Sequence, residues 1–170
     1  MYFFTADQHF GHSRIREFCA RPFCSVVEMD EEIIRRHNEV VKAEDVVVHG
    51  GDFTLKPSFK EAMKYAEQLN GDHIFVVGSH DAWLKNTHHH EIWQKTIEGQ
   101  HIVVCHYAMR VWPKSHYGSW QFFAHSHGGL EPQGKQHDIG VDNNNFYPNS
   151  FDKLKEIMKN RPDNFNLVKK

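Results

Sequence analysis

Residues 2–9 read Tyr-Phe-Phe-Thr-Ala-Asp-Gln-His, a short apolar run that ends in a carboxylate and an imidazole. We predict that residues 2–6 form a strand, because a short apolar run closed by a polar residue is typical of a buried strand. The same pattern recurs along the chain. Further strands are expected at residues 46–48, 74–77, 102–105, 120–124 and 138–141.

Helical segments lie between these strands. Asp30 is a candidate N-cap for a helix over 31–42, and Pro57 fits the first turn of a helix that continues to Leu69. A last helix is expected from Ser150 to just before Arg161. The alternation predicts one α/β domain over residues 1–170 with an at least partly parallel sheet. The polar, histidine-rich segment 85–100 is expected to be a surface excursion.

Composition excludes several classes of protein. The 170 residues carry 20 Lys and Arg against 22 Asp and Glu, and this balance argues against a dedicated nucleic-acid-binding surface. No apolar stretch is long enough for a membrane span, and the N-terminus lacks the features of a signal peptide. We therefore expect a cytoplasmic protein. The three cysteines have no CxxC spacing and indicate neither a disulfide framework nor a cysteine-based zinc site.

The residues that follow each strand are unusually rich in groups that bind metals. In open α/β sheets, ligands bind beyond the carboxyl ends of the strands, so these residues are expected to share one edge. The five strand ends read Asp7-Gln8-His9, His49-Gly50-Gly51-Asp52, Gly78-Ser79-His80-Asp81, Cys105-His106 and His125-Ser126-His127-Gly128. Glycines beside them would let the backbone turn tightly and approach a ligand.

Carboxylates and imidazoles without thiolates suit Mn, Fe, Zn or similar divalent ions. A D-x-H or H-x-H pair on an extended segment points both side chains to one face, so each pair could clamp one cation. Asp52, between the two clamps, could bridge two ions about 3.5–4 Å apart. Each piece alone also has a structural interpretation, such as a turn residue for Asp52. The five pieces together favour a metal site, whereas the run 88–90 is expected to be a solvated loop.

This set of motifs resembles the calcineurin-like metallophosphoesterases, whose pattern is D-x-H, G-D, G-N-H-D/E, a lone H and G-H-x-H. Here the pattern appears as Asp7-Gln8-His9, Gly51-Asp52, Gly78-Ser79-His80-Asp81, His106 and Ala124-His125-Ser126-His127. The resemblance covers residues 2–127. It extends to small bacterial and phage members through the stretches 10–12, 18–23 and 141–143.

The resemblance implies a β-sandwich flanked by helices, with a dinuclear metal site at the carboxyl-terminal edge of the strands. It implies two divalent ions, Mn first among them and Fe, Ni or Zn as alternatives. A hydroxide that bridges the ions would attack a phosphomonoester or phosphodiester, with nucleotides among the candidate substrates. The implied roles are Asp7, His9 and His127 at one metal, Asp52 between the metals, His106 and His125 at the other, His80 assisting the leaving group and Asp81 orienting the His80 ring.

Ser79 departs from the family pattern. The family has Asn there, and its amide oxygen binds the second metal. The serine hydroxyl is shorter and a poorer donor, so we expect Ser79 to make a weaker second-metal site. The alternative to an enzyme is a binding or scaffold protein on the same fold that catalyses little. The sequence leaves the oligomeric state open.

Two residues are candidates for contact with the substrate. His12 lies close enough to His9 to reach a bound phosphate, or to support a metal-binding residue instead. Arg110, four residues past His106, could contact phosphate with two parallel hydrogen bonds, or could simply be solvated. The aromatic and basic stretch 107–120, which includes Trp112, could form a substrate wall that stacks on a nucleobase, or pack as core.

Overall fold

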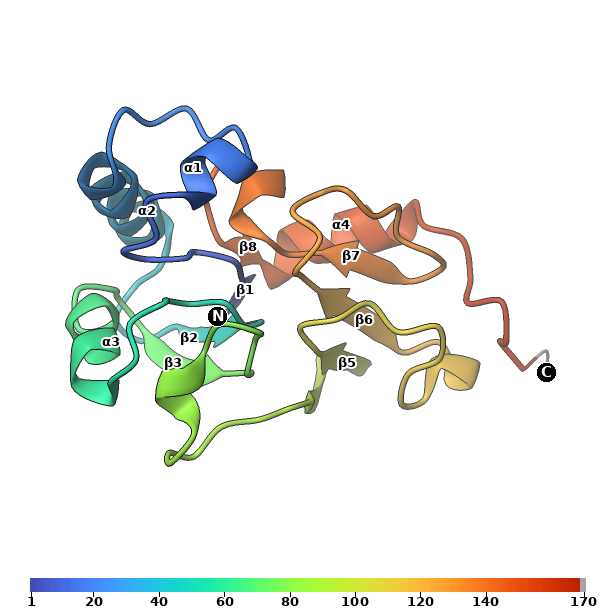
Figure 1. Ribbon diagram of the computed structural model, residues 1–170. Coiled ribbons are helices and arrows are strands. Elements are labelled where there is room, and N and C mark those ends of the chain that lie inside the picture. Colours follow the sequence, from blue (N-terminus) through green and yellow to red (C-terminus); the bar gives the residue numbers. More distant parts are fainter. Residues whose placement is uncertain (169–170) are drawn as a thin grey trace.

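The computed structural model describes residues 1–168, which form two four-stranded sheets (Figure 1). The first sheet has the order β3-β2-β1-β8 and the second has the order β4-β5-β6-β7. Both sheets are mixed, because β8 is antiparallel to β1, β4 is antiparallel to β5, and all other pairs are parallel. The strands are β1 Tyr2–Thr5, β2 Val46–His49, β3 Asp72–Phe75, β4 Trp93–Ile97, β5 Gln100–Val104, β6 Trp120–Phe123, β7 Gln136–Asp138 and β8 Asn149–Ser150.

The two sheets pack against each other around one apolar core. Phe4 of β1 and Val48 of β2 point into this core, and the ring of Phe4 lies 4.9 Å from that of Phe122 on β6. Helix α4, Phe151–Lys159, adds Leu154 and Met158 to the same core. Its predicted start after Ser150 is confirmed, since the Ser150 hydroxyl accepts a hydrogen bond from the backbone of the first turn.

Helices cover the other face of the first sheet. Helix α2, Val26–Val40, and helix α3, Phe59–Ala66, lie on the side of this sheet away from the second sheet (Figure 1). Their apolar side chains form a second core with Phe10 and Phe53, which lie in the segments after β1 and β2. The short helix α1, Ile15–Phe18, follows the end of β1. The structure is thus an α/β arrangement, as predicted. Single 3₁₀ turns span Ala82–Leu84, Ser115–Tyr117 and Val141–Asn143.

The predicted start of α2 is wrong by five residues. The helix begins at Val26 because the Ser25 hydroxyl accepts a hydrogen bond from the backbone of Glu28, whose carboxylate accepts one from the backbone of Cys24. This is a Ser-x-x-Glu start signal that the sequence carries. Asp30 therefore lies inside the helix, where its buried carboxylate accepts hydrogen bonds from the backbone of Gly11.

The start of α3 is also misplaced, because Ser58 caps this helix and Pro57 lies outside it. The segment 85–100 is not simply a surface excursion, since it contains β4, which pairs with β5 and buries Trp93 and Ile97. Strands β3 and β7 each begin two residues earlier than predicted, at polar residues held by their pairing with neighbouring strands. No helix within residues 1–168 has both the length and the apolar character needed to cross a membrane.

Candidate metal centre

The ends of strands from both sheets are joined at one place. The backbone nitrogen of Asp7 donates to the carbonyl of Gly51 at 3.0 Å, and that of His9 donates to the carbonyl of Asp52 at 3.0 Å. The segments after β1 and β2 therefore run side by side. From the second sheet, the backbone nitrogen of His125 donates to Oδ2 of Asp7 at 2.9 Å. These bonds bring the predicted motifs of the two sheets together, as expected for residues at strand ends.

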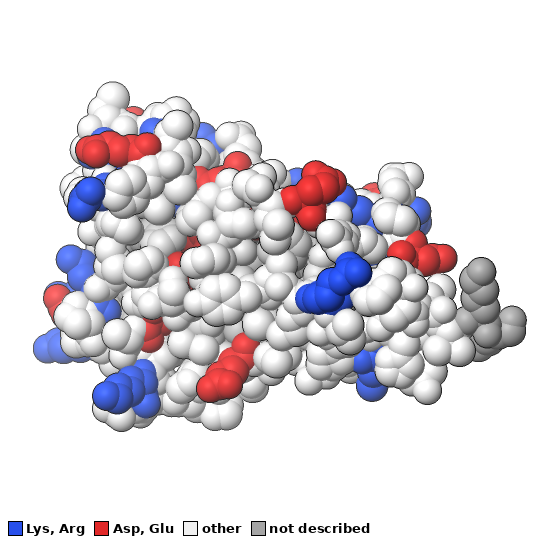
Figure 2. Space-filling model, turned by 45° about the vertical axis from the view of Figure 1, so that its right-hand side comes forward, with Lys and Arg blue, Asp and Glu red and all other residues white. Residues whose placement is uncertain are grey.

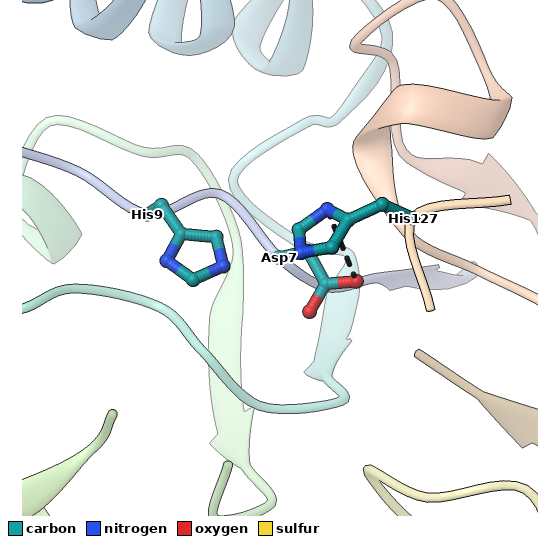
Figure 3. Close-up of side chains that lie close together, drawn as sticks. All are labelled: Asp7, His9 and His127. Atoms are coloured by element: carbon teal, nitrogen blue, oxygen red, sulfur yellow. Dashed lines mark ion pairs between the residues drawn. The ribbon is translucent and has the colours of Figure 1, made fainter. Parts of the chain in front are cut away.

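The predicted metal ligands fall into two compact groups. In the first, Asp7, His9 and His127 offer ligand atoms within 4.8 Å of one another, and Figure 3 shows their side chains pointing toward a common space. The second group, Asp52, His106 and His125, has the same spread. Oδ2 of Asp52 lies 3.6 Å from Nε2 of His9 and 3.4 Å from Nε2 of His106, so this carboxylate lies between the groups.

The backbone at these residues is not extended. Five of the six residues in the two groups have a positive φ: Asp7 56°, His9 54°, Asp52 54°, His125 69° and His127 46°. The prediction of an extended D-x-H and an extended H-x-H is therefore wrong. Asp7 and His9 still converge on one group, but His125 and His127 lie in different groups, so the H-x-H pair does not clamp a single cation as predicted. A left-handed conformation at a non-glycine residue costs of order 1–3 kcal/mol and clusters at functional sites. The surrounding hydrogen bonds must hold this strain.

Two glycines make the close packing of the loops possible. A Cβ atom at Gly51, where φ is +103°, would lie 2.5 Å from Nδ1 of His106. A Cβ atom at Gly78 would overlap the backbone nitrogen of Asp52. Any side chain at either position would push Asp52 or His106 out of place, so these glycines allow close approach between loops of the protein itself. Their predicted approach to a ligand stays a prediction.

Three buried polar atoms at the centre have no hydrogen-bond partner among the described residues. They are Oδ1 of Asp7, Nε2 of His9 and Nε2 of His106. Leaving such a group unpaired costs about 1–3 kcal/mol, and a cation that accepts its lone pair removes this cost. A carboxylate oxygen and two imidazole nitrogens are donors that divalent transition metals accept. The residues present therefore fit bound cations.

In His106 and His127, a hydrogen bond at one ring nitrogen leaves the other nitrogen free to bind a metal. Nδ1 of His106 lies 3.0 Å from the carbonyl oxygen of Gly50, which can only accept, so Nδ1 carries the proton and Nε2 keeps its lone pair. Nδ1 of His127 lies 2.8 Å from Oδ2 of Asp142. Partners of this kind orient a ligating imidazole and raise its basicity.

Burial shifts the charge state of the first group. It raises the pKa of Asp7 to about 7 and lowers the pKa of His9 to about 3. Burial by itself would raise the pKa of Asp52, but its close contact with His106 and the hydrogen bond from the backbone nitrogen of His80 hold that pKa well below its usual value. His9 is thus neutral near pH 7 and Asp52 is ionised, which are the states that a metal requires.

Ser79 and His80 both contact the carboxylate of Asp52. The Ser79 hydroxyl donates to Oδ2 at 3.0 Å, and the backbone nitrogen of His80 donates to Oδ1 at 2.8 Å. The His80 side chain is 43% exposed, and its Nε2 lies 4.0 Å from Oδ2 of Asp52. Ser79 is therefore at the predicted position beside the second group, and His80 lies at its rim.

Asp81 does not take the predicted position beside the His80 ring. Its buried carboxylate accepts hydrogen bonds from the backbone nitrogens of Asp52, Phe53 and Gly78, and from the indole of Trp83. None of its hydrogen bonds within residues 1–168 goes to His80. Asp81 instead fixes the loop that carries Asp52, because four donors converge on its two oxygens.

A cleft of about 690 Å³ opens over these groups. Its lining residues are His9, His12, Ile15, Phe18, Cys19, Asp52, Leu55, His80, His125, Ser126, His127 and Gly129. His12 thus faces the cleft. Its Nδ1 also lies 3.4 Å from Nδ1 of His9, so the structure is consistent with either alternative, contact with a substrate or support of His9.

Arg110 does not line this cleft and is exposed, which favours the solvated alternative over contact with a phosphate bound there. Its guanidinium donates to Gln133 at 2.8 Å and stacks on the ring of Phe165 at 4.3 Å. In the stretch 107–120, Trp112 is buried and its indole donates to the carbonyl of Ser119. Trp112 therefore packs as core, and no residue of the stretch lines the cleft. Tyr107 is the exception to simple packing, since its half-exposed ring lies 4.9 Å from the rings of His106 and His125. Figure 2 shows charged side chains of both signs scattered over one face, without a broad patch of either sign.

Sequence reasoning assigned no role to three residues that lie beside the site. Arg21 donates to both oxygens of Asp142 at 2.8 Å and to the carbonyls of Asp7 and Gln8. The one sequence signal for Arg21 and Asp142 is that they lie in the stretches 18–23 and 141–143, which resemble the small bacterial and phage members of the family. Cys19, a free cysteine, groups with His127 and Asp142 within 4.8 Å, but burial raises the pKa of its thiol and disfavours the thiolate that binds metals.

No family model matches the chain. The chain is 29% identical over 171 residues to the uncharacterized protein MJ1445 of Methanocaldococcus jannaschii, a match that covers 92% of this chain and 90% of that protein. Among solved structures, it is similar to the protein of unknown function AQ665 from Aquifex aeolicus. The TM-score is 0.69 at 21% identity, and the match covers 92% of this chain and 98% of that one. This likeness concerns the fold alone.

Proposed function

We propose that this protein is a metal-dependent hydrolase of phosphate esters, of the calcineurin-like metallophosphoesterase type, with two divalent ions, Mn first among them. The observation that carries the proposal is the convergence of two ligand groups on either side of Asp52, at five residues with a left-handed backbone. Backbone strain at five residues around three buried ligand atoms without hydrogen-bond partners is typical of a functional site and is not needed for packing. The substrate is a phosphomonoester or phosphodiester.

Asp7, His9 and His127 would hold one ion, His106 and His125 the other, and Asp52 would contact both. Ions bound there would activate water and neutralise the phosphate oxygens. The chain itself contributes orientation: Asp142 fixes His127, and the Gly50 carbonyl fixes His106. These contacts keep the ligand nitrogens in place without rearrangement when the ion binds.

The His80 imidazole is the residue proposed to act on the substrate. It lies at the rim of the cleft, its backbone is tied to Asp52, and its side chain is 43% exposed. An exposed imidazole there could donate a proton to the leaving oxygen of the ester. His12, whose ring lies 6.1 Å from that of His80, is placed to contact the phosphate.

One observation favours a second candidate function, a binding protein that catalyses little. Ser79 occupies the position where the resemblance expects a metal-binding amide, and its hydroxyl instead hydrogen-bonds to Asp52. A weak second-metal site would leave a protein that binds one ion and phosphate without rapid turnover.

The test is hydrolysis of p-nitrophenyl phosphate and bis-p-nitrophenyl phosphate with Mn, Ni, Fe or Zn added. The proposal expects activity with at least one ion, and its loss in Asp52→Ala and His80→Ala. Activity on the diester alone would identify a phosphodiesterase. Metal binding without hydrolysis of either ester would favour the binding protein instead.

A further inference from the structure

Part of the lining of the cleft is apolar. Ile15 and Phe18 of α1 and Leu55, which we call the wall, line the same cleft as His9 and His80. Phe18 is 62% exposed and Leu55 is 38% exposed, whereas Ile15 is buried. Apolar side chains that remain exposed beside convergent polar groups are a common feature of ligand sites.

The Phe18 ring is held in place although it is exposed. The guanidinium of Arg14 lies over the ring at 4.8 Å from its centre, and the His12 ring meets it nearly edge to face at 6.4 Å. These contacts limit the motion of the ring, so less entropy is lost when a ligand packs on it.

His12 connects this wall to the metal-binding groups. Its ring lies 5.4 Å from the His9 ring and 6.1 Å from the His80 ring. A phosphate at the histidines and a flat group at Phe18 would therefore lie on either side of His12. This separation by one side chain suits two parts of a single small molecule.

The charge of the cleft limits what that molecule can be. No Lys or Arg is among the described residues that line it. Among these lining residues a chain of several phosphates would meet no fixed positive charge, although the Arg14 guanidinium lies beside the wall, 4.8 Å from the centre of the Phe18 ring. An aromatic ring would meet an exposed aromatic side chain.

We propose that the wall of Ile15, Phe18 and Leu55 binds a flat aromatic ring, either a nucleobase or an aryl group, that belongs to a phosphate monoester or diester. Phe18 is then the residue that selects aromatic esters over aliphatic ones. The inference rests on the proposed function, since the phosphate of the same molecule would lie at the metal-binding groups. It places the stacking surface on α1, away from the stretch 107–120.

The experiment measures binding by calorimetry to the Mn-loaded protein with adenosine 5′-monophosphate, phenyl phosphate and methyl phosphate as probes. We expect the two aromatic probes to bind about tenfold or more tightly than methyl phosphate, because stacking on an aromatic side chain contributes that much. Phe18→Ala should remove most of this preference and leave methyl phosphate binding unchanged. Phe18→Trp should retain it.

Phe165→Ala is the matched control, since Phe165 is 63% exposed and also lies under an arginine, Arg110, but outside the cleft. It should change the affinity for none of the probes. Equal affinities of the wild type for all three probes, or a preference that survives Phe18→Ala, would overturn the proposed aromatic-binding wall. The proposed function would still stand in that case, provided that the protein binds methyl phosphate and hydrolyses the esters. Absence of both methyl phosphate binding and hydrolysis would overturn the proposed function and the wall with it.

Discussion

Nδ1 of His127 lies 2.8 Å from Oδ2 of Asp142, and the same carboxylate is held by the guanidinium of Arg21. The Arg21 side chain is fully buried and also donates to the carbonyls of Asp7 and Gln8. Burial by itself would raise the pKa of Asp142, but the hydrogen bonds from His127 and Arg21 outweigh burial, and the pKa lies below its usual value. A triad of Arg21, Asp142 and His127 thus joins the backbone of one predicted ligand to the ring of another.

Asp142→Asn should weaken metal binding about 10–100-fold, because the substitution removes the charge that orients His127 while it keeps the size of the side chain. The measurement is a titration of Mn²⁺ by calorimetry. Asp152→Asn is the control, since Asp152 is exposed and pairs only with Lys155 at 2.7 Å among its ion-pair partners in the described chain. Equal affinities in the two variants would show that the triad does not support the site.

Ser79→Asn should raise the number of ions bound per chain at limiting metal, and the hydrolysis rate with it. An amide oxygen reaches further than the hydroxyl that now bonds to Asp52. Metal content after dialysis, measured by mass spectrometry, checks the count. If neither stoichiometry nor activity rises, Ser79 is not the weak point of the second group.

His80→Ala should lower kcat about 10²–10⁴-fold, the typical contribution of a positioned proton donor, with little change in metal affinity. His80 lies at the rim and its backbone bond to Asp52 survives the substitution. His88→Ala, which removes an exposed histidine outside the cleft, should leave kcat unchanged. A parallel loss of metal affinity and rate in His80→Ala would assign His80 to the metal instead of the substrate.

His37 provides a prediction about stability and pH. Its Nε2 lies 2.9 Å from the carbonyl of Asn70, and its ring packs near those of His49 and His73. Burial lowers the pKa of His37 to about 4. In the unfolded chain His37 takes up a proton near pH 6.5, whereas in the folded chain it does so only near pH 4. The contribution of His37 to the free energy of unfolding is therefore fully present above pH 6.5 and is lost as the pH falls from 6.5 to 4.

The contribution of His37 amounts to about 3 kcal/mol between those two pH values. Urea unfolding at pH 7 and pH 4 measures it. His37→Gln, which cannot take up a proton, should lose less unfolding free energy over this range than the wild type. The control His116→Gln, at an exposed histidine, should lose as much as the wild type. Parallel losses in wild type and His37→Gln would contradict the assignment.

The strand ends explain why so much of the candidate site is visible in the sequence. Each predicted ligand follows a short apolar run, and the edge of the sheets collects them because parallel strands end on the same side. Asp7, His9, Asp52, His106, His125 and His127 accordingly lie together. The α/β class follows from the same alternation.

What the sequence left out depends on contacts that no spacing reveals. Arg21 and Asp142 are 121 residues apart, and only the folded chain pairs them. The left-handed backbone at Asp7 and His9 follows from bonds to the segment after β2. Arg110 lies four residues after His106, which makes it a candidate for contact with phosphate, but its guanidinium hydrogen-bonds to Gln133 and stacks on Phe165. Tertiary partners, absent from a local pattern, decided each of these cases.

The central claim is that phosphate-ester hydrolysis here depends on ions held around Asp52. The most direct measurement is the rate of bis-p-nitrophenyl phosphate and p-nitrophenyl phosphate hydrolysis by chelator-treated protein as Mn²⁺ is added back, for wild type and Asp52→Asn. We predict no hydrolysis without metal, a saturable rise for the wild type and none for Asp52→Asn. Hydrolysis that persists after chelation, or a variant as active as the wild type, would contradict the account.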